Sequence, residues 1–235
     1  MSNLLEITAV TKRFGGITAL DQVDYACEKG HIIGLLGPNG SGKTTLLKAL
    51  NGLLTVEGSI LIDGNPVGPV TKGLVSYLPD RNYFDEKMTV KKAVAFFKDF
   101  YADFDETKAL TLLADFSIDI NQKLKHLSKG NKEKVQLILA ISRKARLYLF
   151  DEPLGGVDPA ARSVILDLIL KNYDPEATVI ISTHLIADIE SIFDEVIFLK
   201  DGKVVLSGDA DTVREEKGKS IDELFREVFQ CSVNF

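Results

Sequence analysis

The stretch GLLGPNGSGKTTLLKALN, from Gly34 to Asn51, decides the fold of this 235-residue chain. Residues 37–44 within it match the pattern G-x-x-x-x-G-K-[ST] at every fixed position. The apolar residues 32–36 predict a buried strand before the pattern, and residues 44–51 predict a helix after it. In that context glycines let the loop curl its backbone N–H groups around a phosphate, and the helix N-terminus adds a positive dipole. The sequence therefore predicts binding of a nucleoside triphosphate, in preference to an ordinary glycine-rich turn.

Two residues at the end of this loop predict how the phosphates are held. Lys43 is expected to reach the β- and γ-phosphates, and the Thr44 hydroxyl is expected to take one position on Mg2+. The nucleotide contacts that we expect from the loop are Gly37, Pro38, Asn39, Gly40, Ser41, Gly42, Lys43, Thr44 and Thr45.

A pair of carboxylates ends a second apolar strand, in the stretch RLYLFDEP at residues 146–153. Asp151 is the expected second anchor for Mg2+, usually through water. Glu152 comes one peptide later, so extended geometry would turn its side chain to the other face of the strand. From there it could act as a general base on a water aligned with the γ-phosphate. The alternative is an acidic strand end exposed to solvent, which the phosphate loop in the same chain disfavours.

The order of apolar patterns predicts the fold class. Alternating residues predict strands of an antiparallel sheet at residues 5–9, 23–27 and 60–62. After residue 30, alternating strands and helices predict a mainly parallel sheet with right-handed crossovers. We therefore expect an α/β fold with a P-loop NTPase core, an N-terminal antiparallel β subdomain and an inserted α-helical subdomain near residues 83–145. These parts are expected to form one domain, residues 1–235.

The helical segment carries an aromatic stripe, which we expect to be core, because exposed apolar patches are the exception in soluble proteins. The residues that share this helical face are Val90, Ala93, Val94, Phe96, Phe97, Phe100 and Tyr101. Asp105 has the position of an N-cap for a second helix that runs to Phe116. Ser128 is expected to open a third helix, which extends to about Lys144.

Composition excludes several classes of protein. The net charge of −6 provides no general basic surface, so we expect no nucleic-acid partner. No apolar run approaches the ~18–20 residues of a membrane-spanning helix, and the start MSNLLEITAV lacks a signal-peptide pattern. Cys27 and Cys231 lie too far apart in the sequence to suggest a disulfide framework, and Cys27 is expected in the core. We expect a cytosolic protein that reaches a membrane only through a partner.

Taken together in order, these motifs resemble the nucleotide-binding subunit of an ATP-binding-cassette (ABC) transporter over nearly the whole chain. The matching features, in the family's order, are Phe14, the loop 37–44, a Leu-Ser-x-Gly signature at 127–130, Asp151-Glu152, Asp158 and His184. The resemblance implies that Phe14 stacks on the adenine of ATP, that Asp158 is an acidic switch residue at the nucleotide, and that His184 bonds the γ-phosphate. On composition alone Phe14 could equally be a core side chain, and a histidine after a strand is ordinarily a core residue, an interpretation that the family position of His184 reverses.

The same resemblance implies partners. Ser128 and the Gly130 N–H, at a second helix N-terminus, would bind the γ-phosphate of a nucleotide held by an opposite ATP-binding subunit, in an ATP-dependent homo- or heterodimer with two sites. Hydrolysis would drive a separate integral membrane permease from the cytoplasmic face of the cell membrane. The ending Lys219–Phe225 resembles that of exporter ATPases, so we expect export. The alternatives are a soluble ABC ATPase without a transporter and a weakly hydrolysing, ATP-sensing regulatory module.

Three departures from the family's pattern bear on the expected rate of ATP hydrolysis more than on nucleotide binding. Asp80 stands where the family usually has Gln, and we expect it to be a metal contact and a hinge toward the helical segment. The signature reads LSKGN in place of LSGGQ, and Lys129 could add a cation near the phosphates or point to solvent. The loop before Asp158 contains Gly155 and Gly156, which should make it more flexible.

Overall fold

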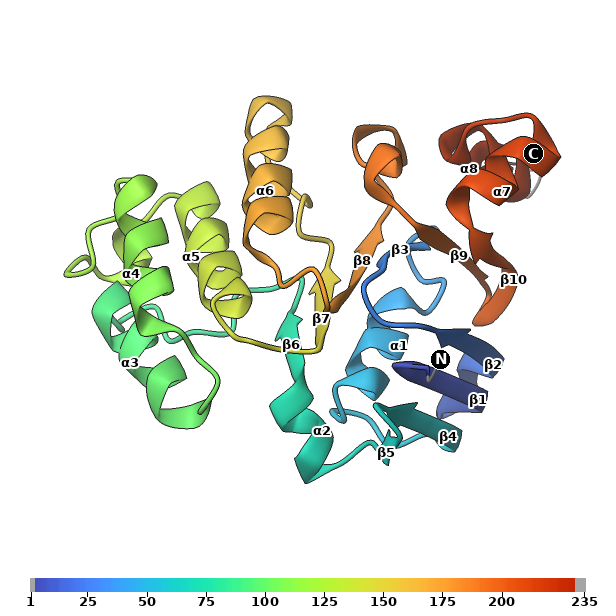
Figure 1. The fold of residues 1–235 in the computed structure, drawn as a ribbon, viewed down its shortest axis with the longest axis horizontal. Helices are drawn as coiled ribbons and strands as arrows, with labels where there is room; N and C mark the ends of the chain where they lie inside the picture. The colour runs from blue at the N-terminus through green and yellow to red at the C-terminus, as the bar shows by residue number, and fades with distance from the viewer. Residues whose placement is uncertain (1–2, 231–235) are drawn as a thin grey trace.

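A six-stranded central sheet forms the core of the computed structural model, which describes residues 3–230 without the side chains of Ala160, Ala161 and Gln230. The strand order is β10-β9-β3-β8-β7-β6. The strands are β3 (Ile32–Leu36), β6 (Val75–Leu78), β7 (Leu147–Asp151), β8 (Thr178–Thr183), β9 (Glu195–Lys200) and β10 (Lys203–Asp209). All neighbours are parallel except the β9–β10 hairpin. The mainly parallel sheet expected from the sequence is confirmed (Figure 1).

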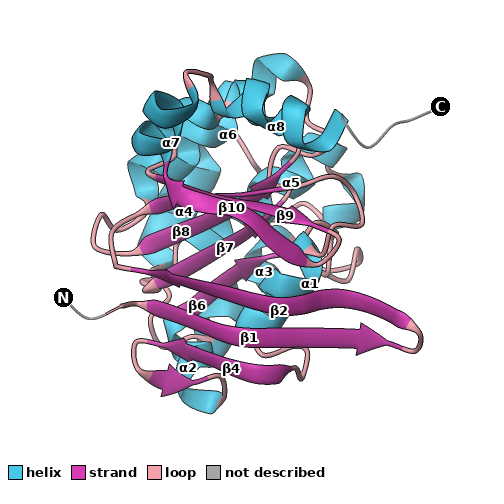
Figure 2. Ribbon diagram, turned by 90° about the vertical axis from the view of Figure 1, so that its right-hand side faces the viewer, coloured by secondary structure: helices cyan, strands magenta, loops and turns pink. Residues whose placement is uncertain are grey.

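An antiparallel sheet lies beside the central one, as the N-terminal alternation predicts (Figure 2). Its strand order is β2-β1-β4-β5. The strands are β1 (Leu5–Phe14), β2 (Ile17–Cys27), β4 (Glu57–Ile62) and β5 (Asn65–Pro66). Helix α1 (Lys43–Leu50) contributes Leu46, Leu47 and Leu50 to the apolar core that both sheets share. The N-terminus of α1 is thereby fixed at the carboxyl end of β3.

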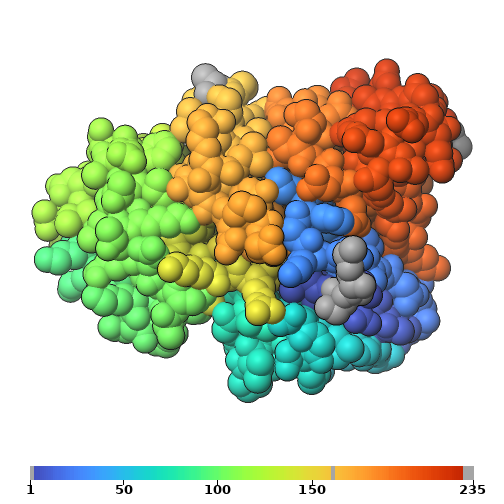
Figure 3. All heavy atoms as spheres, viewed as in Figure 1, coloured from blue at the N-terminus to red at the C-terminus, as the bar shows by residue number. Residues whose placement is uncertain are grey.

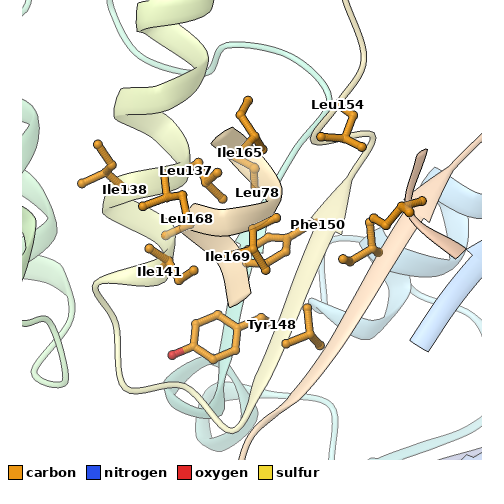
Figure 4. Close-up of a cluster of buried hydrophobic side chains, with 14 of the residues drawn as sticks. Leu78, Leu137, Ile138, Ile141, Tyr148, Phe150, Leu154, Ile165, Leu168 and Ile169 are labelled. Carbon is orange, nitrogen blue, oxygen red and sulfur yellow. The ribbon is translucent and has the colours of Figure 1, made fainter. Parts of the chain in front are cut away.

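Helices cover the other face of the central sheet. Strand β7 alternates, with Leu147 and Leu149 in the core shared with α1, and Tyr148 and Phe150 on the opposite face. There α5 (Lys129–Ile141) and α6 (Pro159–Asn172) pack on it. Figure 4 shows Tyr148 and Phe150 among leucine and isoleucine side chains of these two helices. A strand buried on both faces reads as a continuous apolar run, which is why this strand was identifiable from its sequence.

The helical segment lies at one end of the molecule, with α3 (Val90–Phe100) and α4 (Glu106–Asp115) outside α5 (Figure 1). Asp105 caps α4 by accepting a hydrogen bond from the Lys108 N–H, as predicted. The aromatic stripe is core only in part, because Val90, Ala93, Val94 and Phe97 are buried. The expectation of core is wrong for Phe96 and Phe100, which are 41% and 69% exposed.

The remaining helices complete the surface, and the sequence patterns predicted none of them. They are α2 (Pro69–Leu74), α7 (Ala210–Lys217), α8 (Ile221–Gln230) and short 3-10 turns at Leu124–His126, Ile186–Asp188 and Glu190–Ile192. Cys27 is buried, and Cys231 lies outside the described residues. Within residues 3–230 none of the helices combines the length and apolar character needed to cross a bilayer.

Candidate functional site

The candidate site lies at the carboxyl ends of the parallel strands, where β3 leads into the glycine loop. Two glycines of this loop have no room for a side chain. A Cβ on Gly37 would come within 2.4 Å of the Leu199 carbonyl, and a Cβ on Gly42 within 2.5 Å of the Ala19 carbonyl. Gly42 is also left-handed, with φ 111°, at the N-cap of α1. The loop geometry therefore requires the glycines that the sequence pattern singled out.

The interior of the loop suits a phosphate. The Ser41 hydroxyl is buried and has no hydrogen-bond partner among the described residues. A Cβ on Gly37 would come within 2.4 Å of this hydroxyl, and Ser41 stands just before α1, whose first N–H groups lack partners within the helix. A buried hydroxyl without a partner calls for an explanation, and a bound phosphate or water beside the loop would supply one. The residues present thus fit a phosphate group held by Ser41, the α1 N-terminus and Lys43.

Lys43 is 6% exposed, and its ammonium turns back onto the loop. The Nζ atom donates to the carbonyl oxygens of Gly37, at 2.6 Å, and Pro38, at 3.3 Å. It also lies 3.5 Å from Glu152 Oε1. The structure therefore joins the loop lysine directly to one of the two carboxylates from the β7 end.

Asp151 is buried and accepts hydrogen bonds from three hydroxyl groups. Oδ1 receives Ser182 Oγ at 2.7 Å and Thr44 Oγ1 at 3.1 Å, and Oδ2 receives the Tyr77 hydroxyl at 3.4 Å. Burial raises the pKa of Asp151, the bonds from Ser182 and Thr44 lower it, and the charges of Asp80 and Glu152 raise it further. The Thr44–Asp151 contact brings together the two groups that were expected to anchor Mg2+.

Glu152 departs from the extended geometry expected of it. Its φ is +50°, in the left-handed region, because β7 ends at Asp151 and the chain turns there. The turn is closed by the Gly155 N–H, which bonds the Glu152 carbonyl at 2.8 Å. The Glu152 carboxylate lies beside Lys43, next to Thr44, which contacts Asp151. The expected opposition of the two side chains is therefore wrong.

His184 follows β8 and is a partner of Glu152. Its Nδ1 lies 2.9 Å from Glu152 Oε2, and its side chain is 45% exposed, so the alternative of a core histidine is wrong. Asp80 stands two residues after β6, with its carboxylate 3.7 Å from Arg81 Nε. Its charge acts on Asp151, but no direct contact among the described residues joins Asp80 to Asp151 or Thr44. Asp80 therefore lies at the same edge of the sheet without belonging to the hydrogen-bonded group.

The other expected nucleotide contacts lie outside this group. Phe14 ends β1 and is 48% exposed, with Lys12 Nζ 5.2 Å from its ring centroid, so the alternative of a core phenylalanine is wrong. Ser128 caps α5 by accepting the Asn131 N–H at 3.3 Å, and a Cβ on Gly130 would meet open space. Asp158 immediately precedes α6. Among residues 3–230 no contact joins Ser128 or Gly130 to the glycine loop of the same chain.

Lys129 was expected either to add a cation near the phosphates or to point to solvent, and it does neither fully. Its side chain is 72% exposed, but the ammonium rests on the loop before Asp158, where a Cβ on Gly156 would come within 2.2 Å of Nζ. Glu133, one helical turn along α5, has its Oε1 3.8 Å from the same nitrogen. Lys129 thus bridges the signature helix and the Gly155-Gly156 loop of its own chain.

Two residues of the site were missed by the motifs. Ser182 and Tyr77 both bond Asp151, from the neighbouring strands β8 and β6. A polar side chain inside a buried strand needs a partner, and that was the available signal. The identity of the partner could not be predicted, because the register between neighbouring strands cannot be read from the sequence of either strand alone.

Proteins of similar sequence and fold are known. The sequence model of a family described as "ABC transporter" matches residues 20–155. The Bacillus subtilis ABC transporter ATP-binding protein YtrB is 33% identical over 217 residues, which are 91% of this chain and 74% of that protein. A solved ATP binding subunit of an ABC transporter has a TM-score of 0.86 at 29% identity and covers 96% of this chain and 99% of its own. A dimeric ATP-binding cassette bound to ADP and Pi shares the fold, with a TM-score of 0.77 at 24% identity, covering 87% of this chain and 98% of its own.

Proposed function

The chain belongs to the ABC transporter family of ATP-binding proteins, and from that premise we propose that it binds and hydrolyses Mg·ATP to power a separate membrane permease. The observation that carries the proposal is the connected group at the end of β7. Lys43 pairs with Glu152, and Thr44 with Asp151, at the N-terminus of the helix that the glycine loop opens. Binding, metal and water-activating groups are thus adjacent.

The residues suggest a division of roles. The loop N–H groups, Ser41 and Lys43 would hold the phosphates, while Thr44 and Asp151 would hold Mg2+, with Asp80 as a further metal contact. The metal would neutralise charge that develops on the phosphates. To reach a phosphate, Lys43 would exchange its contacts with the Gly37 and Pro38 carbonyls for phosphate oxygens. Glu152, freed from Lys43, would then accept a proton from the attacking water, while His184 orients its carboxylate.

The second anion site supports a dimer. Ser128 and Gly130 stand at the N-terminus of α5, away from the glycine loop of the same chain. A second ATP-binding subunit, identical or homologous, could present this helix end to the γ-phosphate, and the first would return the contact. The Asp158 loop would lie in the same interface, and Phe14 would stack on the adenine.

A groove beside the helical segment offers a place for the permease. It has a volume of about 890 Å3 and lies between the α1–α2 region and α3. Figure 3 shows these two parts, teal and green, on either side of an indentation. Its exposed apolar side chains are Leu53, Tyr83, Phe96 and Phe100. We propose that residues 83–145 act as a subdomain and that an apolar segment of the permease enters this groove.

A route from the groove to the site is present. Arg143, 3% exposed, lines the groove, pairs with Asp103 at 3.1 Å, and donates to the carbonyl of Val75 at the start of β6. Strand β6 leads to Asp80. A partner in the groove could therefore act on the metal site through this strand. We place the subunit on the cytoplasmic face of the membrane, where ATP is available, and propose export from the Lys219–Phe225 ending.

Phosphate release from Mg·ATP by the purified chain tests the enzymatic part. Wild-type protein should turn over ATP, and Lys43→Ala should not, because it lacks the group that holds the β- and γ-phosphates. ATP binding without phosphate release in the wild type would favour the ATP-sensing module. Recovery from gently solubilised membranes without any membrane protein would favour the soluble ABC ATPase.

A further inference from the structure

Ser182 is a fully buried residue of β8 that faces the end of β7, with Asp151 as its register partner. Its hydroxyl donates to Asp151 Oδ1 at 2.7 Å and accepts the Glu152 N–H at 3.0 Å. The Ser182 carbonyl also accepts that N–H, at 3.1 Å. One residue thus contacts the side chain of one carboxylate residue and the backbone of the next.

These contacts act on two unfavourable features of the site. Glu152 is left-handed, a conformation that residues with a Cβ rarely adopt, and both acceptors for its N–H belong to Ser182. Asp151 is a buried carboxylate, and the bond from Ser182 is the shortest of the three that it accepts. Without the hydroxyl, Asp151 would lose a donor, and the Glu152 turn would lose one of its restraints.

Strand β8 and the residue that follows it hold Glu152 at two points. Ser182 binds its backbone, and His184, two residues further along, binds its carboxylate at 2.9 Å. The Glu152 backbone is therefore held by β8, and its carboxylate is held by His184 just after β8 and by Lys43. Asp151 is tied to the same strand, again through Ser182.

We propose that Ser182 is a positioning residue that sets the orientation of Asp151 relative to Glu152 and so aligns the metal site with the water-activating carboxylate. This inference rests on the proposed function of the two carboxylates. Ser182 itself touches neither nucleotide nor metal in this arrangement and acts through its neighbours. Its loss should weaken metal binding and turnover while leaving metal-free nucleotide binding intact.

Thr178 provides a matched control on the same strand. It is also fully buried, its hydroxyl accepts the Gly30 N–H at 3.1 Å and donates to the Glu28 carbonyl at 3.2 Å, and it lies at the other end of β8. Both hydroxyls accept one N–H and donate once, but only Ser182 donates to a carboxylate of the site. Thr178→Val therefore reports what the loss of such a hydroxyl does to the fold alone.

The experiment compares wild type, Ser182→Ala, Ser182→Thr and Thr178→Val. Mn2+ binding in the presence of ADP is measured by electron paramagnetic resonance, and nucleotide binding in EDTA is measured by fluorescence. Phosphate release is measured with Mg·ATP.

Ser182→Ala should lose about tenfold in Mn2+ affinity, as outer-shell changes at metal sites do, and its kcat should fall. Its ADP affinity in EDTA should stay within about twofold, because the glycine loop is untouched. Ser182→Thr retains the hydroxyl and should recover most of the Mn2+ affinity, whereas Thr178→Val should lose none.

Wild-type Mn2+ affinity and turnover in Ser182→Ala would overturn the proposal, as would an equal loss in Thr178→Val. If Ser182→Ala does not fold, Ser182→Cys keeps the volume with a weak donor and should show the same loss of metal affinity. A wild-type chain that binds Mn·ADP but releases no phosphate would contradict the proposed ATPase. The Mn2+ comparison would still decide the role of Ser182.

Discussion

The Lys43 ammonium lies 3.5 Å from Glu152 Oε1, so the lysine of the phosphate loop is paired with the carboxylate expected to activate water. The same ammonium donates to two carbonyls of its own loop, and the same carboxylate holds His184. If ATP binds as proposed, its phosphate oxygens would compete with Glu152 for this ammonium. Under the proposed function, nucleotide binding would draw Lys43 toward the phosphates and so would release Glu152.

Replacing Glu152 with Gln should reduce phosphate release by at least about tenfold, since the general base is removed. ATP affinity should be equal to or higher than that of the wild type, because Lys43 no longer has a charged competitor. Phosphate release and fluorescent-nucleotide titration measure the two effects. Glu176→Gln, in an exposed pair 3.6 Å from Lys29, is the control and should change neither. Weaker ATP binding in Glu152→Gln would contradict the competition.

The same variant should form a dimer on gel filtration with Mg·ATP and run as a monomer without nucleotide. Adding Gly130→Glu should prevent the dimer, because a carboxylate at the α5 N-terminus would repel the partner's γ-phosphate. The monomer should tolerate the change, since a Cβ at Gly130 meets open space. Glu152→Gln protein that stays monomeric at saturating ATP would argue against the two-site arrangement.

Phe14→Ala should weaken ATP binding by about fivefold or more, since a base stacked on an aromatic ring gains about 1–3 kcal/mol. Phe14→Tyr should change it little, because the ring remains. Ile17→Ala is the control, since Ile17 pairs with Phe14 across the β1–β2 turn and is 72% exposed. Equal ATP affinity in wild type and Phe14→Ala would remove Phe14 from the nucleotide site.

Asp80 should alter the Mg2+ requirement of the ATPase. Asp80→Gln should keep activity within about threefold, because an amide oxygen can still ligate the metal. Asp80→Ala should need a higher Mg2+ concentration for half-maximal rate. The three Mg2+ titrations are compared at one saturating ATP concentration. Superimposable curves would mean that Asp80 is a surface residue without a role at the metal.

Lys129 and Gly156 should behave as a coupled pair. Gly156→Ala would place a methyl group 2.2 Å from Lys129 Nζ, and it also strains a backbone with φ +74°. Amide hydrogen exchange of residues 153–158 in nucleotide-free protein should rise in Lys129→Gly and in Gly156→Ala, because each removes the ammonium from the loop. In the Lys129→Gly background, Gly156→Ala should add only the effect of the backbone strain. Fully additive effects would show that the two residues act independently.

Local patterns were sufficient for the elements that place the site. The glycine loop depends on φ values that only glycine adopts easily, and β7 is buried on both faces. Each therefore has a recognisable pattern within a short stretch of sequence. The antiparallel strands and the helix caps at Asp105 and Ser128 follow from such local patterns. These features were predicted because their physical causes lie within a few residues.

Other features depend on residues far apart in the chain. Ser182 bonds Asp151 from a neighbouring strand, and Lys129 reaches Gly156 from another helix. Phe96 and Phe97 are adjacent in one aromatic stripe, yet only Phe97 is buried, because the packing of α3 against its neighbours selects the face. The sequence by itself determined the phosphate loop, the strand that ends in two carboxylates and the family. Only the tertiary structure decided the left-handed turn at Glu152 and its pairing with Lys43, because strand register and side-chain packing are set by contacts across the whole sheet.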